Sequence, residues 1–323
     1  MASQKTQEKI LMPKFFKGKH IFITGGTGSF GHTIVGELLK LDVSKVTVYS
    51  RDEEKQLDME GEFSDPRLDF VIGDVRDYDR LRETIKPRTD IVYHAAALKV
   101  IPTCEKHPLE AVKTNLLGSI NVRKACLEKD VGKALLISTD KAVKPVNAYG
   151  MTKALAEKIW ISDMKGLSTL FSVVRYGNVV GSRGSVVPYF QNLMSQKKPL
   201  PITDRRMSRF LITLKQAINL VFKATATMVG GEIFVPKIPA CKVTDLAEAM
   251  GGNDYPITIT GIRPGEKIAE VLISEEEIRR TKDLEKYFVI EPHGSAKTQE
   301  LLEEYTSENT TQLKIEEIKE LIS

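Results

Sequence analysis

Cysteine and tryptophan are scarce in this sequence. Its 323 residues include one tryptophan and three cysteines, Cys104, Cys126 and Cys241, with no C-x-x-C pair among them. No histidine stands at metal-ligand spacing from these cysteines. The pattern predicts that the three cysteines are reduced thiols that pack in the core of a cytoplasmic protein, and no metal site is expected.

Long apolar runs are also missing. No stretch of about 18 apolar residues, the length that crosses a bilayer, occurs in the chain. Residues 1–20 are polar and lack the apolar block of a signal peptide. We therefore expect no contact with a membrane.

A strong excess of one charge is absent as well. The 47 basic and 43 acidic residues give a formal net charge of +4. No basic stripe interleaved with aromatic residues accompanies them, so a nucleic-acid partner is not expected. The length allows one large α/β unit with an appended lobe, or two domains.

Apolar, β-branched runs alternate with amphipathic stretches over the first half of the chain. We expect strands at residues 20–24, 45–49, 69–72, 91–94, 134–137 and 170–174, and helices around residues 32–41, 78–85, 108–128 and 149–164. This alternation predicts an α/β fold with a Rossmann-like, doubly wound parallel sheet. After Gly177 the pattern loosens, which favours a cofactor domain over residues 15–177 and a smaller C-terminal lobe over residues 178–323, with segments exchanged between them. The charged stretch 298–323 is expected to be helical.

A glycine-rich turn follows the first expected strand. Its sequence is Gly25-Gly26-Thr27-Gly28-Ser29-Phe30-Gly31, and it opens the next helix. Glycines let the backbone approach a pyrophosphate closely, and a helix N-terminus offers N–H donors to it. We therefore expect Thr24, Gly25, Gly28, Ser29, Phe30 and Gly31 to bind a dinucleotide; a plain tight turn is the alternative.

The ends of the next strands refine this cofactor prediction. Ser50 and Arg51 end the second strand, where an arginine suits the 2′-phosphate of NADP, while Asp52 leaves NAD possible. Asp74 and Val75 follow the third strand and are expected beside the adenine, although Asp74 is as easily interpreted as a helix N-cap. Small residues Ala95, Ala96 and Ala97 leave room for a flat cofactor after the fourth strand.

Two short runs carry the chemistry. Tyr149 and Lys153 are four residues apart and share one helix face, so the ammonium is expected to favour the phenolate, which can take a proton from a sugar hydroxyl. Ser138-Thr139-Asp140-Lys141 adds an acid and a second amine, which a simple alcohol dehydrogenase does not need. His94 is interpreted as a core histidine, and Asn115 as a residue that orients backbone.

Together these residues resemble the extended short-chain dehydrogenase/reductase family. Longer stretches, at residues 138–142, 148–153, 174–188, 200–204, 231–237 and 261–267, resemble one subgroup, the inverting UDP-N-acetylglucosamine 4,6-dehydratases of pseudaminic acid synthesis. The similarity spans roughly residues 15–320, with a shorter segment after residues 287–290 as its main departure. A sister group that makes fucosamine-type sugars typically has methionine where Tyr149 stands.

The resemblance implies a mechanism. Tyr149 takes the C-4 hydroxyl proton as hydride passes to tightly held NADP⁺, with Thr139 on the same oxygen and Lys153 lowering the phenol pKa. Lys141 then removes the C-5 proton, Asp140 protonates the departing C-6 hydroxyl, and hydride returns to C-6 with inversion at C-5. Lys141 must be neutral for part of this cycle, and burial and the Lys153 charge are expected to lower its pKa.

Substrate contacts are expected mainly from the C-terminal lobe. Arginines pair bidentately with phosphate, and Asn178 follows the sixth strand on the sugar-phosphate side. The residues expected to bind UDP-N-acetylglucosamine are Lys99, Asn178, Thr203, Arg205, Arg209, Arg263 and Glu266. By resemblance the chain forms homo-oligomers, either dimers or hexamers.

Three other functions stay open. A UDP-sugar 4-epimerase or a retaining dehydratase would use the same fold, but an epimerase needs no acid–base pair beside Thr139, and retaining dehydratases typically carry Asp-Glu at positions 140 and 141. A non-catalytic NADP-binding redox sensor could dispense with Tyr149 and Lys153. Fold alone decides none of this.

Overall fold

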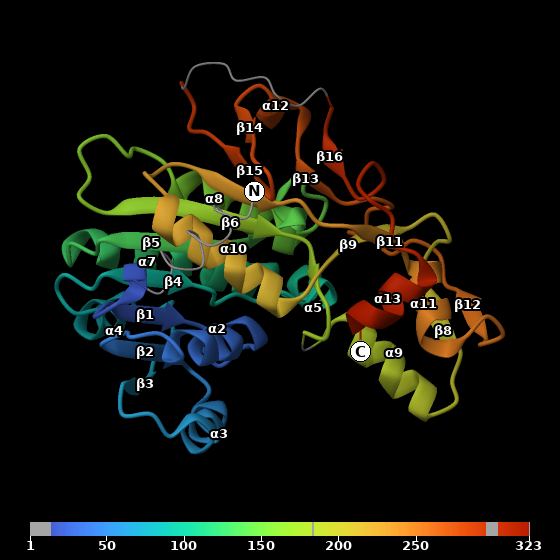
Figure 1. Cartoon of the computed structure of the whole chain (residues 1–323), viewed down its shortest axis with the longest axis horizontal. Coiled ribbons are helices and arrows are strands. Elements are labelled where there is room, and N and C mark those ends of the chain that lie inside the picture. The colour runs from blue at the N-terminus through green and yellow to red at the C-terminus, as the bar shows by residue number, and fades with distance from the viewer. Residues whose placement is uncertain (1–13, 183, 295–302, 323) are drawn as a thin grey trace.

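The computed structural model describes residues 14–182, 184–294 and 303–322. Its centre is a nine-stranded sheet in the order β14-β15-β10-β6-β5-β4-β1-β2-β3 (Figure 1). The strands are β1 (His20–Thr24), β2 (Lys45–Ser50), β3 (Leu68–Ile72), β4 (Ile91–His94), β5 (Lys133–Thr139), β6 (Leu170–Tyr176), β10 (Ile233–Pro236), β14 (Thr281–Asp283) and β15 (Tyr287–Ile290). All pairs from β3 to β10 are parallel, which confirms the predicted doubly wound sheet.

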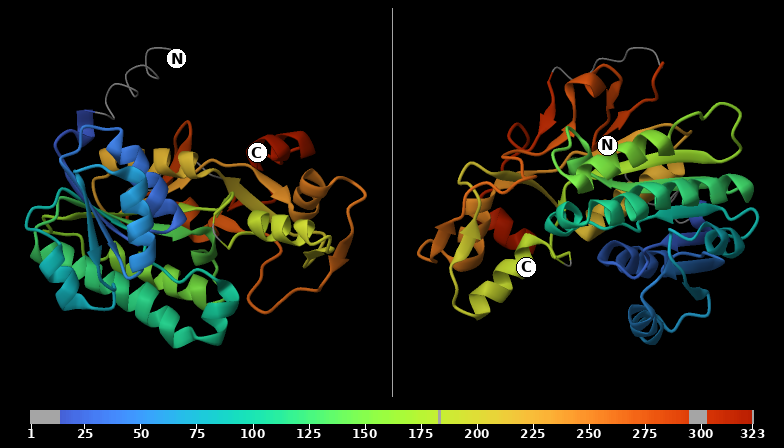
Figure 2. Two further views of the ribbon diagram at one scale, coloured as in Figure 1. Left: turned by 90° about the horizontal axis from the view of Figure 1, so that it is seen from below. Right: turned by 180° about the vertical axis from the view of Figure 1, so that it is seen from behind.

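Helices cover both faces of this sheet. One face carries α2 (Ser29–Leu39) and α10 (Leu214–Thr227), which pack on each other in front of the strands in Figure 1. The other carries α4 (Tyr78–Thr84), α7 (Gly118–Glu128) and α8 (Ala148–Trp160), seen from behind in Figure 2. The parallel strands are buried from both sides, which is why they appear in the sequence as continuous apolar runs.

The helix expected over residues 108–128 is interrupted in the structure. It consists of α6 (Pro108–Ala111), a π-helical turn (Val112–Leu117) and α7. Asn115 lies in that turn, and its side-chain amide bonds both the N–H and the C=O of Leu98, at 2.8 and 2.9 Å. A widened turn of this kind is common at functional sites. Here it lets one asparagine fix the loop that follows β4.

Strands from the second half of the chain return to the large sheet. β10 pairs with β6, and β15 and β14 extend that edge as antiparallel strands. The chain therefore crosses between the large sheet and a small lobe, defined here as the elements that pack beyond the edge of that sheet. It contains β7 (Asn178–Val179), β8 (Leu200–Ile202), β9 (Ser208–Ile212), β11 (Ala240–Lys242), β12 (Ile257–Ile259), α9 (Val186–Ser195), α11 (Val243–Gly251) and α13 (Ile315–Ile322).

The C-terminal segment is only partly helical. β16 (Tyr305–Thr306) pairs with β13 (Val271–Ile273), and α13 closes the apolar core of the small lobe through Ile318. Residues 298–302 and 323 of the expected helical stretch lie outside the described residues. The remaining short helices are α3 (Glu53–Phe63), α5 (Ile101–Lys106) and α12 (Glu275–Ile278). Within the described ranges, no helix is both long and apolar enough to cross a membrane.

Candidate active site

The glycine turn lies at the carboxyl end of β1, against the loop that follows β4. Gly25 has φ +68°, and a Cβ there would lie 2.7 Å from the Ala96 backbone, so only glycine fits. Helix α2 begins at Ser29, and its N-cap residue, Gly28, supplies no side-chain cap. Its first-turn N–H groups are therefore not capped by that residue, as an anion-binding helix N-terminus requires.

The end of β2 faces the end of β3 through a small charged cluster. Ser50 Oγ bonds Thr27 Oγ1 at 2.8 Å, while the Arg51 guanidinium, 57% exposed, stands 3.6 Å from Asp74. Burial opposes ionisation of Asp74, but hydrogen bonds and charge from Arg76 outweigh it and lower the Asp74 pKa. The alternative of Asp74 as an N-cap is wrong, because Asp77 caps α4 and Asp74 instead accepts from Arg76 N in the preceding turn.

These residues suit a dinucleotide chemically. The start of α2 provides backbone N–H donors for a pyrophosphate. The glycine turn and the small, half-buried side chains of Ala95, Ala96 and Ala97 leave room for the cofactor at the same edge of the sheet. Val75, which follows β3, is buried. His94 is the expected core histidine, since it is buried between Thr24 Oγ1 at 2.6 Å and Ser119 Oγ at 2.9 Å.

The catalytic cluster forms where β5 meets α8. Thr139 ends β5, and Asp140 and Lys141 lie in a single 3₁₀ turn directly after it. Asn147 then caps α8 by accepting from Gly150 N at 2.7 Å, and this start places Tyr149 and Lys153 one turn apart. The five predicted catalytic residues therefore come from three consecutive elements, β5, the 3₁₀ turn and α8.

Asp140 and Lys141 form a buried ion pair. Lys141 Nζ lies 3.0 Å from Asp140 Oδ1 and also donates to Asn178 Oδ1 at 2.9 Å. Asp140 is fully buried, and burial raises its pKa although Lys141 acts in the opposite direction. Its second oxygen, Oδ2, has no hydrogen-bond partner in the part of the chain that the structure describes. Such an oxygen is suited to a hydroxyl of a bound ligand.

The expected lowering of the Lys141 pKa is wrong for this structure. Burial does disfavour the ammonium, but the charges of Asp140 and Glu270 outweigh burial and raise the Lys141 pKa. Glu270 Oε1 lies 3.4 Å from Lys141 Nζ. The sequence analysis missed Glu270, because it lies far along the chain and only the fold brings it to Lys141.

The pKa of the Tyr149 phenol also differs from the lowered value that was expected. Burial raises its pKa to about 12, while Lys141 and a hydrogen bond with Thr139 act to lower it. Lys141, rather than Lys153, is therefore the cation with the largest effect on this phenol. Lys153 Nζ donates to Ile137 O at 2.7 Å, and burial lowers its pKa to about 8 against the opposing charge of Glu157.

The predicted substrate residues fall into two groups. Asn178 reaches Lys141, and Arg209 is held by the carbonyl oxygens of Ser208, Lys267 and Ile268. The others lie away from this cluster of contacts: Thr203 is buried, Lys99 and Arg205 are exposed, and Arg263 pairs with Glu266 at 2.6 Å.

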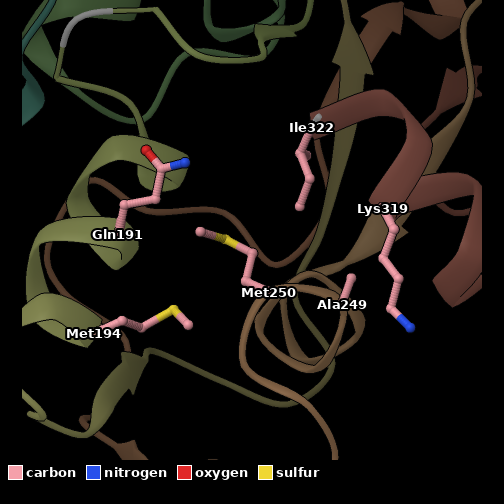
Figure 3. A pocket seen from close by; sticks show the side chains of 6 residues that line it. All are labelled: Gln191, Met194, Ala249, Met250, Lys319 and Ile322. Atoms are coloured by element: carbon pink, nitrogen blue, oxygen red, sulfur yellow. The ribbon is translucent and has the colours of Figure 1, made fainter.

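One hollow in the small lobe lies apart from these residues. Its volume is about 370 Å³. It lies between α9, α11 and α13, whose side chains around it are shown in Figure 3. Its lining consists of Gln191, Met194, Ala249, Met250, Lys319 and Ile322. None of the predicted site residues lines it, so it adds nothing to the catalytic cluster.

The strand order, the glycine turn and the Tyr149–Lys153 helix define a Rossmann-fold chain of the short-chain dehydrogenase/reductase type. Comparison with known proteins narrows this class. The sequence pattern of the family described as "Polysaccharide biosynthesis protein" matches residues 21–292, and its C-terminal counterpart matches residues 281–323. The chain belongs to this polysaccharide biosynthesis family, within the extended short-chain dehydrogenases/reductases, which confirms the resemblance found in the sequence.

Individual relatives carry two kinds of name. An inverting UDP-N-acetylglucosamine 4,6-dehydratase of Campylobacter jejuni is 48% identical over 86% of this chain and 84% of its own length. A UDP-glucose 4-epimerase of Rickettsia bellii is 44% identical over 95% of this chain and 96% of its own. Pen from Bacillus thuringiensis, a solved structure, is 37% identical with a TM-score of 0.90 over 95% of this chain and 98% of its own. The dTDP-glucose 4,6-dehydratase DesIV from Streptomyces venezuelae, solved with NAD, shares the fold at 20% identity, with a TM-score of 0.71 over 77% of this chain and 86% of its own.

Proposed function

We propose that the chain is a nucleotide-sugar enzyme, a UDP-N-acetylglucosamine 4,6-dehydratase that inverts C-5. The buried Asp140–Lys141 pair carries this proposal. Its two groups are hydrogen bonded at 3.0 Å, so one proton transfer converts the ion pair into a neutral amine and a neutral carboxylic acid. These are the base and the acid that removal of a C-5 proton and loss of a C-6 hydroxyl require.

The chain's own residues then have separate tasks. Tyr149, hydrogen bonded to Thr139 and acting as the phenolate, takes the proton of the C-4 hydroxyl. Lys141 takes the proton at C-5, and Asp140 delivers one to the C-6 oxygen through the carboxyl group that has an open acceptor position. Asp140 and Tyr149 are buried and Lys141 is 15% exposed, which limits the access of water to the elimination.

A nicotinamide dinucleotide bound at the glycine turn would supply the hydride acceptor and donor. The fit of that turn and the NAD bound in DesIV support this assignment. We propose NADP, with NAD as the alternative, because Arg51 stands exposed at the end of β2, where a 2′-phosphate would lie. Lys153 would hold the nicotinamide ribose, as it has N–H donors beyond the one given to Ile137.

We assign UDP binding to the C-terminal lobe over residues 178–323. The loop that contains Arg263 and Glu266 is tied to the start of α8 by a 2.8 Å bond from Asn147 Nδ2 to Gly265 O. Arg263, Arg205 and Lys99 are placed on the diphosphate and sugar side, with Thr203 and Glu266 on the uridine. A cytoplasmic homo-oligomer, dimeric or hexameric, in pseudaminic acid synthesis completes the proposal.

A UDP-sugar 4-epimerase is the second candidate. The match to the Rickettsia bellii relative with that name covers 95% of this chain. An epimerase needs the Tyr149 chemistry but has no use for a neutral amine and a carboxylic acid held side by side. The two functions therefore differ in whether the C-5 and C-6 positions react.

Proton NMR of the purified protein with UDP-N-acetylglucosamine in heavy water, with catalytic NADP⁺, separates the candidates. The proposal expects a new 6-methyl signal, deuterium at C-5 and the coupling pattern of an L-arabino ring. A methyl signal with a D-xylo ring would contradict inversion. Formation of UDP-N-acetylgalactosamine alone would establish the epimerase, and no reaction with this substrate would contradict both assignments for it.

A further inference from the structure

The carboxylate of Glu270 forms ion pairs with three cations. It stands directly before β13, and its side chain is 3% exposed. Its carboxylate lies 3.4 Å from Lys141 Nζ, 3.3 Å from Lys267 Nζ and 3.8 Å from Arg209 Nε. The three cations lower the Glu270 pKa although burial opposes ionisation, so this carboxylate is charged at neutral pH.

The backbone of Glu270 is fixed from the other side. Its N–H donates to Ser307 Oγ at 2.9 Å, and Ser307 N donates back to its carbonyl oxygen at 2.9 Å. Ser307 also bonds Ser208 Oγ at 2.7 Å, next to Arg209 on β9. The carboxylate thus has a set position relative to the catalytic turn.

The groups that face Lys141 come from every element around it. Asp140 shares its turn, Tyr149 comes from α8, Asn178 from β7, Arg209 from β9 and Glu270 from the segment before β13. Three acceptor groups surround the Lys141 ammonium: it donates to Asp140 and Asn178, and Glu270 lies 3.4 Å away as an ion-pair partner. Two of these acceptors are carboxylates, so the arrangement stabilises the ammonium form.

This contact bears on the proton transfer between Lys141 and Asp140. A neutral pair forms when the Lys141 proton moves to Asp140, and the Glu270 charge opposes that move because it attracts the ammonium. Arg209 and Lys267 offset part of the Glu270 charge. The balance of charge among these five groups decides how readily Lys141 becomes a base.

We propose that Glu270 is a positioning residue that holds the Lys141 ammonium and sets the pH at which Lys141 gives up its proton. This inference rests on the proposed function only in treating Lys141 as the base. The effect of Glu270 on the titration of Lys141 is independent of any substrate.

The test titrates Lys141 directly. The protein is labelled with ¹³C at the lysine ε-carbons, and the Lys141 signal is identified by its loss in Lys141→Met. Replacing Glu270 by Gln keeps the shape and removes the charge, so the Lys141 midpoint should fall by about one pH unit or more. Lys267→Met removes a cation that offsets Glu270, so it should raise the midpoint. Glu304→Gln, which alters a surface pair with Lys144, is the matched control and should leave the midpoint unchanged.

Each outcome of the titration either supports or overturns the role of Glu270. An unchanged Lys141 midpoint in folded Glu270→Gln overturns the proposal; if that variant does not fold, an unchanged midpoint in Lys267→Met does so. The pH profile of turnover then gives a second readout, whose acidic limb should move to lower pH in Glu270→Gln. Wild-type protein that fails to turn over UDP-N-acetylglucosamine contradicts the proposed function, while the titration still decides the role of Glu270.

Discussion

At the scale of single residues, the site depends on side chains whose charges compensate each other in a buried space. The carboxylates of Asp140 and Glu270 lie 3.0 and 3.4 Å from Lys141 Nζ. The sequence predicted Asp140 and Lys141 because the run Ser138-Thr139-Asp140-Lys141 adds an acid and an amine, and because it resembles the dehydratase subgroup. It could not predict Glu270 or the resulting Lys141 pKa, because a pKa depends on every charge that the fold brings near.

Lys141 itself is open to a direct test. Lys141→Met preserves an unbranched apolar chain but removes the amine, so we expect deuterium incorporation at C-5 to fall by about 100-fold or more. Retention of bound dinucleotide, followed by its absorbance in the purified protein, should be unaffected. Lys144→Met is the control, because that lysine is three residues away, half exposed and paired with Glu304. C-5 exchange at the wild-type rate in Lys141→Met would remove this residue from the mechanism.

At the scale of elements, sequence and structure agree where apolar patterning is strong. The six expected strands are β1 to β6, since buried parallel strands carry continuous apolar runs. Helix α3 was not predicted because Gln56 and Met59 are its only buried residues, so its apolar periodicity is weak. The π-helical turn at Asn115 was missed for another reason: a bond from a side chain to the distant Leu98 backbone leaves no local pattern.

The start of α8 provides a prediction at this scale. Asn147 caps the helix through Gly150 N and also donates to Gly265 O in the loop of Arg263 and Glu266. Asn147→Ala should lower the free energy of unfolding by about 1 kcal/mol, the usual cost of a lost N-cap. It should also raise KM for the nucleotide sugar, because the loop loses its tie to α8.

Asp77→Ala is the matched control for Asn147→Ala. Asp77 caps α4 by accepting from Arg80 N at 3.0 Å, and α4 packs on α7. Urea unfolding of both variants should show a similar loss of stability, whereas steady-state kinetics should show a raised KM for Asn147→Ala alone. Equal KM values would mean that the bond to Gly265 has no part in substrate binding.

At the scale of the whole molecule, one buried arginine joins segments that are far apart in sequence. Arg175 on β6 pairs with Glu157 of the catalytic helix α8 at 2.6 Å and with Glu277 of α12 at 2.9 Å. It also donates to Leu272 O on β13, the strand that follows Glu270. The segment that brings Glu270 to Lys141 is therefore anchored to the helix that carries Tyr149 and Lys153.

This anchor makes the stability of the fold depend on pH. Burial opposes ionisation of Glu277, but Arg175 outweighs it and lowers the pKa from 4.5 to about 2. A carboxyl group with a depressed pKa stabilises the fold above its unfolded pKa, and this contribution is lost as the pH falls through the folded value. The full contribution at neutral pH is on the order of 3 kcal/mol, of which roughly half should be lost by pH 3.

Urea unfolding at pH 7 and pH 3 measures this contribution. Glu277→Gln cannot titrate at this position, so its free energy of unfolding should fall less between the two pH values than that of the wild type, by about 1–2 kcal/mol. Glu316→Gln is the control for an exposed carboxylate, because the Glu316 side chain is 79% exposed, and the pH dependence of this variant should stay close to the wild type. Equal pH dependence in wild type and Glu277→Gln would show that the anchor does not depend on an ionised Glu277. A smaller dependence in the variant would identify the Arg175 pair as an acid-sensitive connection between the catalytic helix and the segment that carries Glu270.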